Sequence, residues 1–140
     1  MLKDDDIRRV ETKIAALEQL TSAEFKVIVC AHAWFGLKRK ARQLFAKHQL
    51  DKTRERNGVL ILLVEKDREF LVYGDEGIHS KVGQNFWQDT SAAMMKDFKR
   101  GDFAQGLIAG LHQLADVLTI HFPARETKAN ELSNEILFEK

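Results

Sequence analysis

The sequence predicts an α/β domain, a small mixed β-sheet flanked by helices in a three-layer-like sandwich. Two short and almost purely apolar runs, residues 25–31 and 59–64, have the length and composition of buried strands. A third run, residues 70–73, follows the second after a polar turn. Segments with helical apolar spacing surround all three runs, so the predicted element order is α-β-α-β-β-α-α.

The first half of the chain supplies two helices and two strands. Three aspartates at 4–6 can cap a helix, and apolar residues recur behind them at helical spacing as far as Leu17. A second helix is expected over residues 37–49, between the first two strands. Strand, helix and strand then form a βαβ unit, which makes the two strands parallel with a right-handed crossover.

The second half begins with a hairpin, because the turn at Lys66-Asp67 makes the third strand antiparallel to the second. A tight loop is expected at 74–77, where two glycines allow unusual backbone angles. A helix follows from about residue 85, and Gly101-Asp102 caps the start of the last helix.

Gly106 and Gly110 lie one turn apart on that last helix and should let it approach the sheet closely. Pro123 is expected to end the folded core. We therefore expect one α/β domain over residues 1–123 and a C-terminal tail over residues 124–140.

Composition excludes several classes of protein. The formal charge of +1 gives no electrostatic reason to expect nucleic acid or a membrane as the main partner. The acidic N-terminus is unlike a signal peptide, and no apolar run approaches the roughly 20 residues of a membrane span. Cys30 is the only cysteine, so the chain forms no internal disulfide, and we expect a cytoplasmic protein.

Polar residues are expected to converge at one edge of the predicted sheet. Glu24 begins the first strand, Asn57 precedes the second, and Asp75 and Glu76 follow the third, which runs the opposite way. Gathered carboxylates repel each other unless a cation or a basic group compensates them, and oxygen-rich clusters suit Ca²⁺ or Mg²⁺. The alternative is that these acids are solvated loop residues or helix caps.

Four runs occur in a characteristic order along the chain: Arg56 to Ile61, Phe70 to Ile78, Phe86-Trp87, and Phe98 to Leu107. Together they resemble the TPM domain family. The segment from Thr21 to Val27 looks like the entry to the family's first strand. The runs His121 to Pro123 and Asn130 to Leu132 look like the tail of its short, stand-alone bacterial members.

The resemblance implies a mixed sheet flanked by helices, with an acidic crevice that binds divalent cations in some members. A plant relative is described as an acid phosphatase and an animal relative as an accessory to a ligand-gated channel. This sequence departs from the family pattern, because His79 stands near an expected glutamate and Gln84 near an expected aspartate.

With the resemblance included, the expected ligands of a Ca²⁺ or Mg²⁺ ion are Glu24 and Asp75, helped by Glu76 or Asp89 and by a polar contact from Asn57. His79 would suit a softer metal such as Zn²⁺, but no second histidine or cysteine stands at ligand spacing.

Three functions are compatible with this reading. The first is a binding or adaptor module with a divalent-cation site and an unidentified protein partner. The second is a weak metal-dependent acid phosphatase, with Arg56 as the one basic residue near the edge and no general acid beside it. The third is a metal-free interaction domain that uses the basic stretch 38–56 or the Trp34 region.

The remaining candidate residues are expected to have structural roles. Cys30 is expected to be a buried structural thiol, and the basic stretch a solvated helix face. Trp34 and Phe35 are expected to pack against the hairpin turn, although exposed rings would mark an interaction patch. Trp87 is expected in the core.

Overall fold

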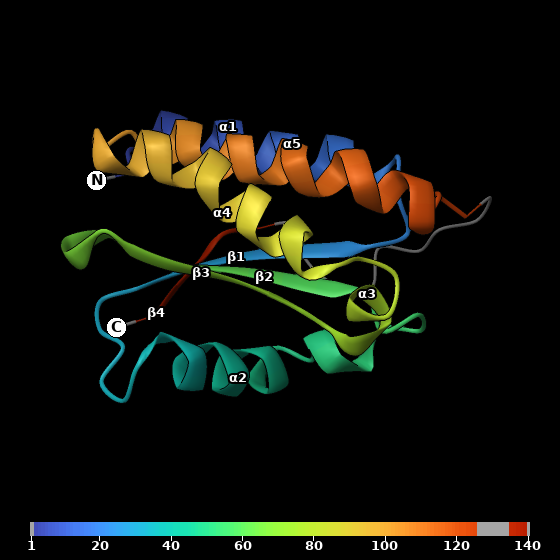
Figure 1. Ribbon diagram of the computed structural model, residues 1–140. Helices are drawn as coiled ribbons and strands as arrows, with labels where there is room; N and C mark the ends of the chain where they lie inside the picture. The colour runs from blue at the N-terminus through green and yellow to red at the C-terminus, as the bar shows by residue number, and fades with distance from the viewer. Residues whose placement is uncertain (1, 126–134, 140) are drawn as a thin grey trace.

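The structure is a computed structural model that describes residues 2–125 and 135–139. Its centre is a four-stranded mixed sheet in the order β3-β2-β1-β4 (Figure 1). The strands are β1 (Glu24–Cys30), β2 (Gly58–Val64), β3 (Glu69–Gly74) and β4 (Leu137–Glu139). β1 is parallel to β2 and to β4, whereas β2 and β3 form an antiparallel hairpin. The predicted α/β class and mixed sheet are confirmed.

Helices cover both faces of the sheet and give the expected three layers. Helices α1 (Asp4–Glu18), α4 (Gln84–Lys99) and α5 (Phe103–His121) lie on one face, and α2 (Leu37–Lys47) lies alone on the other (Figure 1). A four-residue helix, α3 (Glu76–His79), stands where the sequence suggested only a tight loop. Two short 3₁₀ turns, η1 (Leu50–Lys52) and η2 (Glu65–Asp67), complete the described chain.

The two central strands are buried on both faces, which explains why their sequences do not alternate between apolar and polar residues. On β2, Ile61 faces the layer of three helices and Leu62 faces α2, and both are buried. Side chains alternate between the faces of a strand, so a strand covered on both sides must be apolar throughout.

Gly106 and Gly110 of α5 allow close packing against α4. The expectation that they bring α5 close to the sheet is wrong. A Cβ at Gly106 would stand 2.3 Å from the Phe98 ring, and one at Gly110 would stand 2.4 Å from the Met94 sulfur. Both neighbours belong to α4 and are fully buried. The two helices can pack this closely only because α5 lacks side chains at these positions.

The end of the chain completes the sheet. Leu137 pairs with Ile28 and Glu139 with Cys30 along the outer edge of β1. The Glu139 carboxylate accepts hydrogen bonds from Lys47 Nζ at 3.0 Å and His48 Nε2 at 3.2 Å. The sequence left open whether the tail packs on the domain, and residues 136–139 do so, since Ile136 is also buried.

We expect Gly106→Ala to lower the free energy of unfolding by about 1–3 kcal/mol, because the added methyl overlaps the buried Phe98 ring. An ordinary helix would gain stability from the same change. Thermal unfolding monitored by circular dichroism measures the effect. Gly83→Ala is the control for steric overlap, because a Cβ there meets nothing within 4 Å and only the N-cap preference of α4 for glycine over alanine is lost. Equal stability of both variants would contradict the close packing of α4 and α5.

We expect Glu139→Gln to lower stability by about 0.5–1 kcal/mol near neutral pH. The hydrogen bond from Lys47 lowers the pKa of Glu139 below its ordinary value of 4.5. A lowered pKa contributes stability above the ordinary value, and that stability is lost as pH falls through the folded value. Urea unfolding at several pH values should therefore show the difference shrinking in acid. The exposed Asp116→Asn variant is the control, and a pH-independent deficit would contradict the ion pair.

Candidate functional site

The polar residues singled out from the sequence do lie at one edge of the sheet. Glu24 pairs with Gly58 across β1 and β2. The N–H of Asp75 donates to the Gly58 carbonyl at 3.0 Å, which continues the row across β3. Glu24, Asn57 and Asp75 therefore stand on three neighbouring strands, as the βαβ unit and the hairpin predicted.

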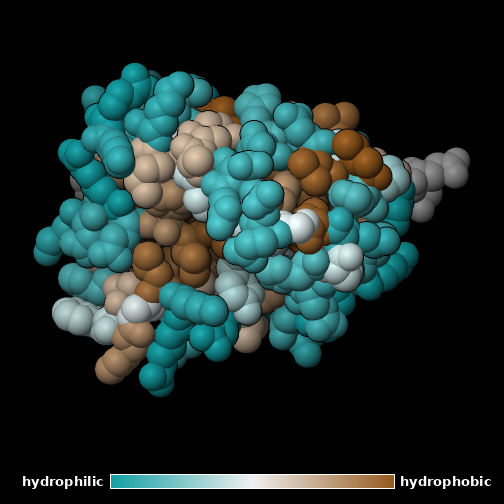
Figure 2. Space-filling view, viewed as in Figure 1, coloured by the Kyte–Doolittle hydropathy of each residue, from teal (hydrophilic) through white to brown (hydrophobic). Residues whose placement is uncertain are grey.

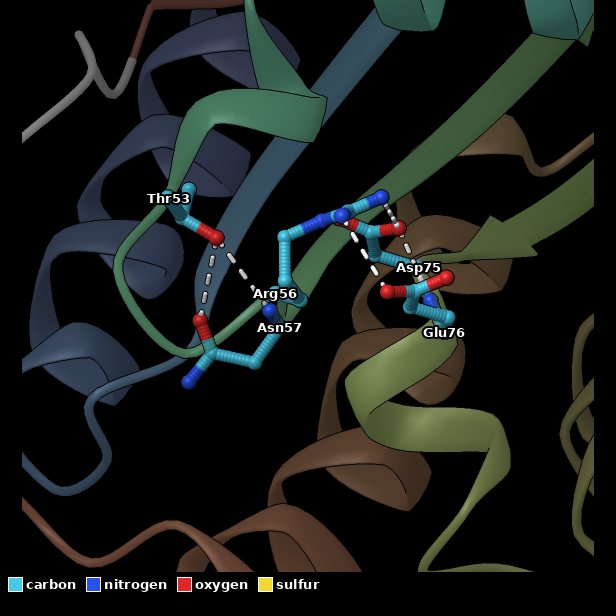
Figure 3. Close-up of polar contacts among 5 residues, drawn as sticks. All are labelled: Thr53, Arg56, Asn57, Asp75 and Glu76. Carbon is cyan, nitrogen blue, oxygen red and sulfur yellow. Dashed lines mark hydrogen bonds and ion pairs between the residues drawn. The ribbon is translucent and has the colours of Figure 1, made fainter.

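Arg56 holds the two carboxylates at the end of β3. Its Nε donates to Asp75 Oδ2 at 2.7 Å, its Nη2 to Asp75 Oδ1 at 2.9 Å, and its Nη1 to Glu76 Oε1 at 3.1 Å (Figure 3). Bidentate pairs of this kind are among the stronger hydrogen bonds in proteins. The hydrogen bond to Asp75 raises the pKa of Arg56. We call these three residues the Arg56 clamp.

Asp75 also begins the short helix α3. Its side chain is only 7% exposed, and its Oδ1 accepts the Glu76 N–H at 2.8 Å. Both carboxylate oxygens of Asp75 therefore accept hydrogen bonds from within the chain. The Asp75 side chain is therefore oriented by its own neighbours.

Gly77 allows the start of α3 to pack directly against the backbone of Glu55 and Arg56. Its N–H donates to the Arg56 carbonyl at 2.9 Å, and a Cβ there would stand 2.3 Å from the Glu55 carbonyl oxygen. Arg56 itself has a φ of 53°, in the left-handed region. From the sequence, Gly77 is predicted only to lie in a loop, because close approach to a segment distant along the chain leaves no local signal.

Asn57 is buried and ties the edge together. Its Nδ2 donates to Ser22 Oγ at 3.1 Å, and its backbone N–H donates to Thr53 Oγ1 at 3.2 Å. The Thr53 hydroxyl also donates to the Asn57 side-chain oxygen at 3.4 Å (Figure 3). Asn57 thus has protein partners for both ends of its amide, which is the behaviour of a structural residue.

Glu24 lies beside a buried lysine that sequence reasoning missed. Lys26 follows two residues later on the same face of β1, and both side chains are buried. Burial lowers the pKa of Lys26, while the charges of Glu18, Glu135, Glu24 and Glu11 act to raise it. A charged residue inside the otherwise apolar run from Phe25 to Cys30 was the available signal.

The other two expected ligands are both exposed. Glu76, on α3, belongs to the Arg56 clamp, whereas Asp89 lies on α4. The His79 ring lies 5.1 Å from the Trp87 ring, centroid to centroid. Trp87 is half-buried and packs on Gly74, where a Cβ would stand 2.3 Å from its ring. Among the described residues, no three His, Cys, Asp or Glu side chains are gathered as metal ligands would be.

The remaining candidates divide between core and surface. Cys30 is buried, and burial raises the pKa of its thiol, which disfavours the reactive thiolate. Trp34 and Phe35 do not pack against the hairpin turn as expected. They are 78% and 80% exposed, because the chain leaves the end of β1 and turns at Gly36, with a φ of 97°, into α2.

The fold and the site can now be compared with known proteins. A family model of the TPM domain matches residues 1–117. The chain belongs to the TPM domain family. A search among curated proteins finds no match.

Solved structures share the fold of this TPM chain. The BA42 protein of the psychrophilic bacterium Bizionia argentinensis is 31% identical, with a TM-score of 0.93 over 99% of this chain and 95% of its own. The N-terminal domain of a P. gingivalis protein is 18% identical, with a TM-score of 0.74 over 91% of this chain and 83% of its own. The N-terminal domain of the Corynebacterium glutamicum cg2496 protein is 10% identical, with a TM-score of 0.69 over 94% and 83%. The last two likenesses concern the fold alone.

The oxygen atoms at this edge are not arranged as ligands of the divalent cation that the family resemblance implied. Asp75 accepts from Arg56 with both oxygens, and Asn57 is bonded to Ser22 and Thr53. Glu24 lies beside the Lys26 ammonium. Each of the expected inner ligands therefore has an internal partner, where a calcium site would offer several oxygens to one point.

We expect Lys26→Met to lower stability by about 3 kcal/mol near pH 7, because it leaves buried carboxylates without their cation. Those carboxylates would then have raised pKa values, so the deficit should shrink as the pH falls toward about 5. Urea unfolding at both pH values measures this. The exposed Lys96→Met is the control, and a variant as stable as the parent at neutral pH would contradict the role of Lys26.

Proposed function

We propose that this TPM chain is a non-catalytic binding module that works without a resident metal ion. In this proposal Arg56 and Lys26 supply the positive charge that a divalent cation would otherwise bring to the acidic edge. The bidentate contact between Arg56 and Asp75 is the observation that carries the proposal. Location in the cytoplasm, with Cys30 reduced, is part of it.

The energetics of the Arg56 clamp favour a metal-free edge. A cation that bound Asp75 would have to displace two charge-assisted hydrogen bonds and a helix cap. Ca²⁺ requires six to eight oxygen ligands, and two adjacent carboxylates supply only a part of that shell. The resident guanidinium is covalently attached, so it competes at a high effective concentration.

The same geometry argues against a phosphatase. An arginine that binds a phosphoryl group directs its N–H groups at the anion, whereas Arg56 donates to Asp75 and Glu76. The two carboxylates also repel a phosphate approaching that guanidinium. Positive charge aimed at the phosphoryl oxygens is what this reaction requires of a protein.

Weak binding of Ca²⁺ or Mg²⁺ is the second candidate, and exposure favours it. The Arg56 side chain is 44% exposed and that of Glu76 is 73% exposed, so solvent reaches the outer side of the clamp. A cation at high concentration could therefore bind Glu76 and compete with Arg56 for Asp75. This candidate predicts that affinity rises when Arg56 is removed.

The two candidates are separated by an amide-shift NMR titration with Ca²⁺ and then Mg²⁺. We expect the parent chain to show no saturable shifts at residues 24, 57 and 74–78 up to about 1 mM cation. Arg56→Met should gain such shifts, because it leaves Asp75 and Glu76 without a counter-ion. The exposed Arg54→Met is the control and should behave like the parent.

Each result of this titration has one meaning. Saturable shifts of the parent at the acidic edge would replace the proposal with the cation candidate. No gain of binding in Arg56→Met would show that Arg56 does not take the place of a cation. Hydrolysis of a simple phosphomonoester by the parent, lost in Arg56→Met but kept in Arg54→Met, would restore the phosphatase.

A further inference from the structure

A second surface, far along the sheet from the acidic edge, combines exposed aromatic rings with basic side chains. It consists of Trp34 and Phe35, in the loop after β1, and of the basic residues at the start of α2, and we call it the aromatic–basic surface. Its members are Trp34, Phe35, Lys38, Arg39, Lys40 and Arg42. Two adjacent aromatic residues that each leave about four fifths of their area in water mark an interaction site.

The charge of this surface has one sign. α2 contains no acidic residue, and its buried residues Ala41, Leu44 and Phe45 face the sheet, so the basic side chains face outward. Lys47 is left out of the surface, because it is paired with Glu139. The remaining basic residues are therefore available to an anionic partner.

Each of the two rings contacts a neighbouring side chain, Arg39 or His32. The Arg39 guanidinium lies 5.1 Å from the centre of the Phe35 ring, and the His32 ring stacks on Trp34 at 4.6 Å. These contacts hold the rings in place and leave their other sides exposed. A partner of this surface must therefore meet apolar and positive groups together.

The hollow within this surface is smaller than a typical small-molecule pocket. The hollow between Trp34, Phe35, Arg39, Lys40 and Gln43 has a volume of about 180 Å³. Pockets for drug-sized ligands are larger, about 300–1,000 Å³. In Figure 2 apolar atoms protrude at the lower left, where Figure 1 places the loop between β1 and α2, beside hydrophilic surface. A projecting surface fits a broad partner that the rings can enter.

We propose that the aromatic–basic surface docks on an anionic phospholipid bilayer. Trp34 and Phe35 would enter the interfacial region, where aromatic side chains are favoured, and the basic residues would lie near the lipid phosphates. No helix among the described residues is long and apolar enough to cross a membrane, so this contact is peripheral and reversible. The inference gives the proposed binding role a surface and does not depend on the Arg56 clamp.

Vesicle binding tests the proposal directly. The chain has two tryptophans, so the Trp87→Phe variant reports Trp34 alone by fluorescence. With chelator present, we expect a blue shift on vesicles of phosphatidylcholine with about one third phosphatidylserine, and none on pure phosphatidylcholine. Binding should weaken as salt is added. Co-sedimentation of the unaltered chain gives the same answer if Trp87→Phe fails to fold.

Variants of the surface have matched controls elsewhere on the chain. Arg39→Glu with Arg42→Glu should weaken vesicle binding by about twentyfold or more, because each basic residue near an anionic surface contributes about fivefold. Lys96→Glu with Lys99→Glu makes the same charge change on α4 and should have a smaller effect. Phe35→Ser should also weaken binding, whereas Ile120→Ser, at a similarly exposed apolar residue on α5, should not.

Three results would overturn the proposal. They are no binding of the parent to anionic vesicles, equal losses in the surface and control variants, and binding to a polyglutamate peptide in place of vesicles. The last would assign the surface to an acidic protein. Arg56→Met should bind vesicles like the parent, so failure here is distinguishable from failure of the proposed metal-free edge.

Discussion

The architecture depends on one constraint, that β1 and β2 are apolar on both faces and must be covered on both. Ile28 and Leu62 on one face and Val27 and Ile61 on the other are all buried, so neither side of the sheet can remain in water. Three helices cover one side and α2 the other, which leaves the ends of the strands for polar groups, with Lys26 as the exception inside β1. Both surfaces considered for function lie at those ends or in the loops that leave them.

At the acidic edge, we propose that basic side chains of the protein compensate the gathered carboxylates, as a metal ion does in other proteins. Carboxylates gathered at the ends of strands repel one another, and each one buried without compensation destabilises the fold. Arg56 binds Asp75 through two hydrogen bonds, and Lys26 lies among four glutamates. In the proposed metal-free edge, the guanidinium and the ammonium take the place of a bound cation. Hydrogen bonds from Asn57 to Ser22 and from the Gly77 N–H to the Arg56 carbonyl join further segments at this edge.

The aromatic–basic surface has the opposite character. The groups of the acidic edge are satisfied within the chain, whereas Trp34 and Phe35 are held in water by a turn and by contacts with His32 and Arg39. Exposed aromatic area is unfavourable in an isolated molecule, so it is where a partner would gain most. Of the two, the exposed surface is better suited to binding and the acidic edge to holding the fold.

The sequence by itself determined the strands β1 to β3, the helices α1, α2, α4 and α5, the pairing of those strands, and the edge at which Glu24, Asn57 and Asp75 meet. It did not predict α3 or β4. Apolar periodicity and the hairpin turn are local signals, and the handedness of the βαβ unit converts them into topology. Only the tertiary structure decided what those residues do. Whether Asp75 meets a metal or Arg56, and whether Lys26 is buried among acids, depends on side chains from distant segments. The sequence also did not predict the exposure of Trp34 or the packing of Gly106 against Phe98. They depend on how the loop leaves β1 and how closely two helices pack, which no local pattern encodes.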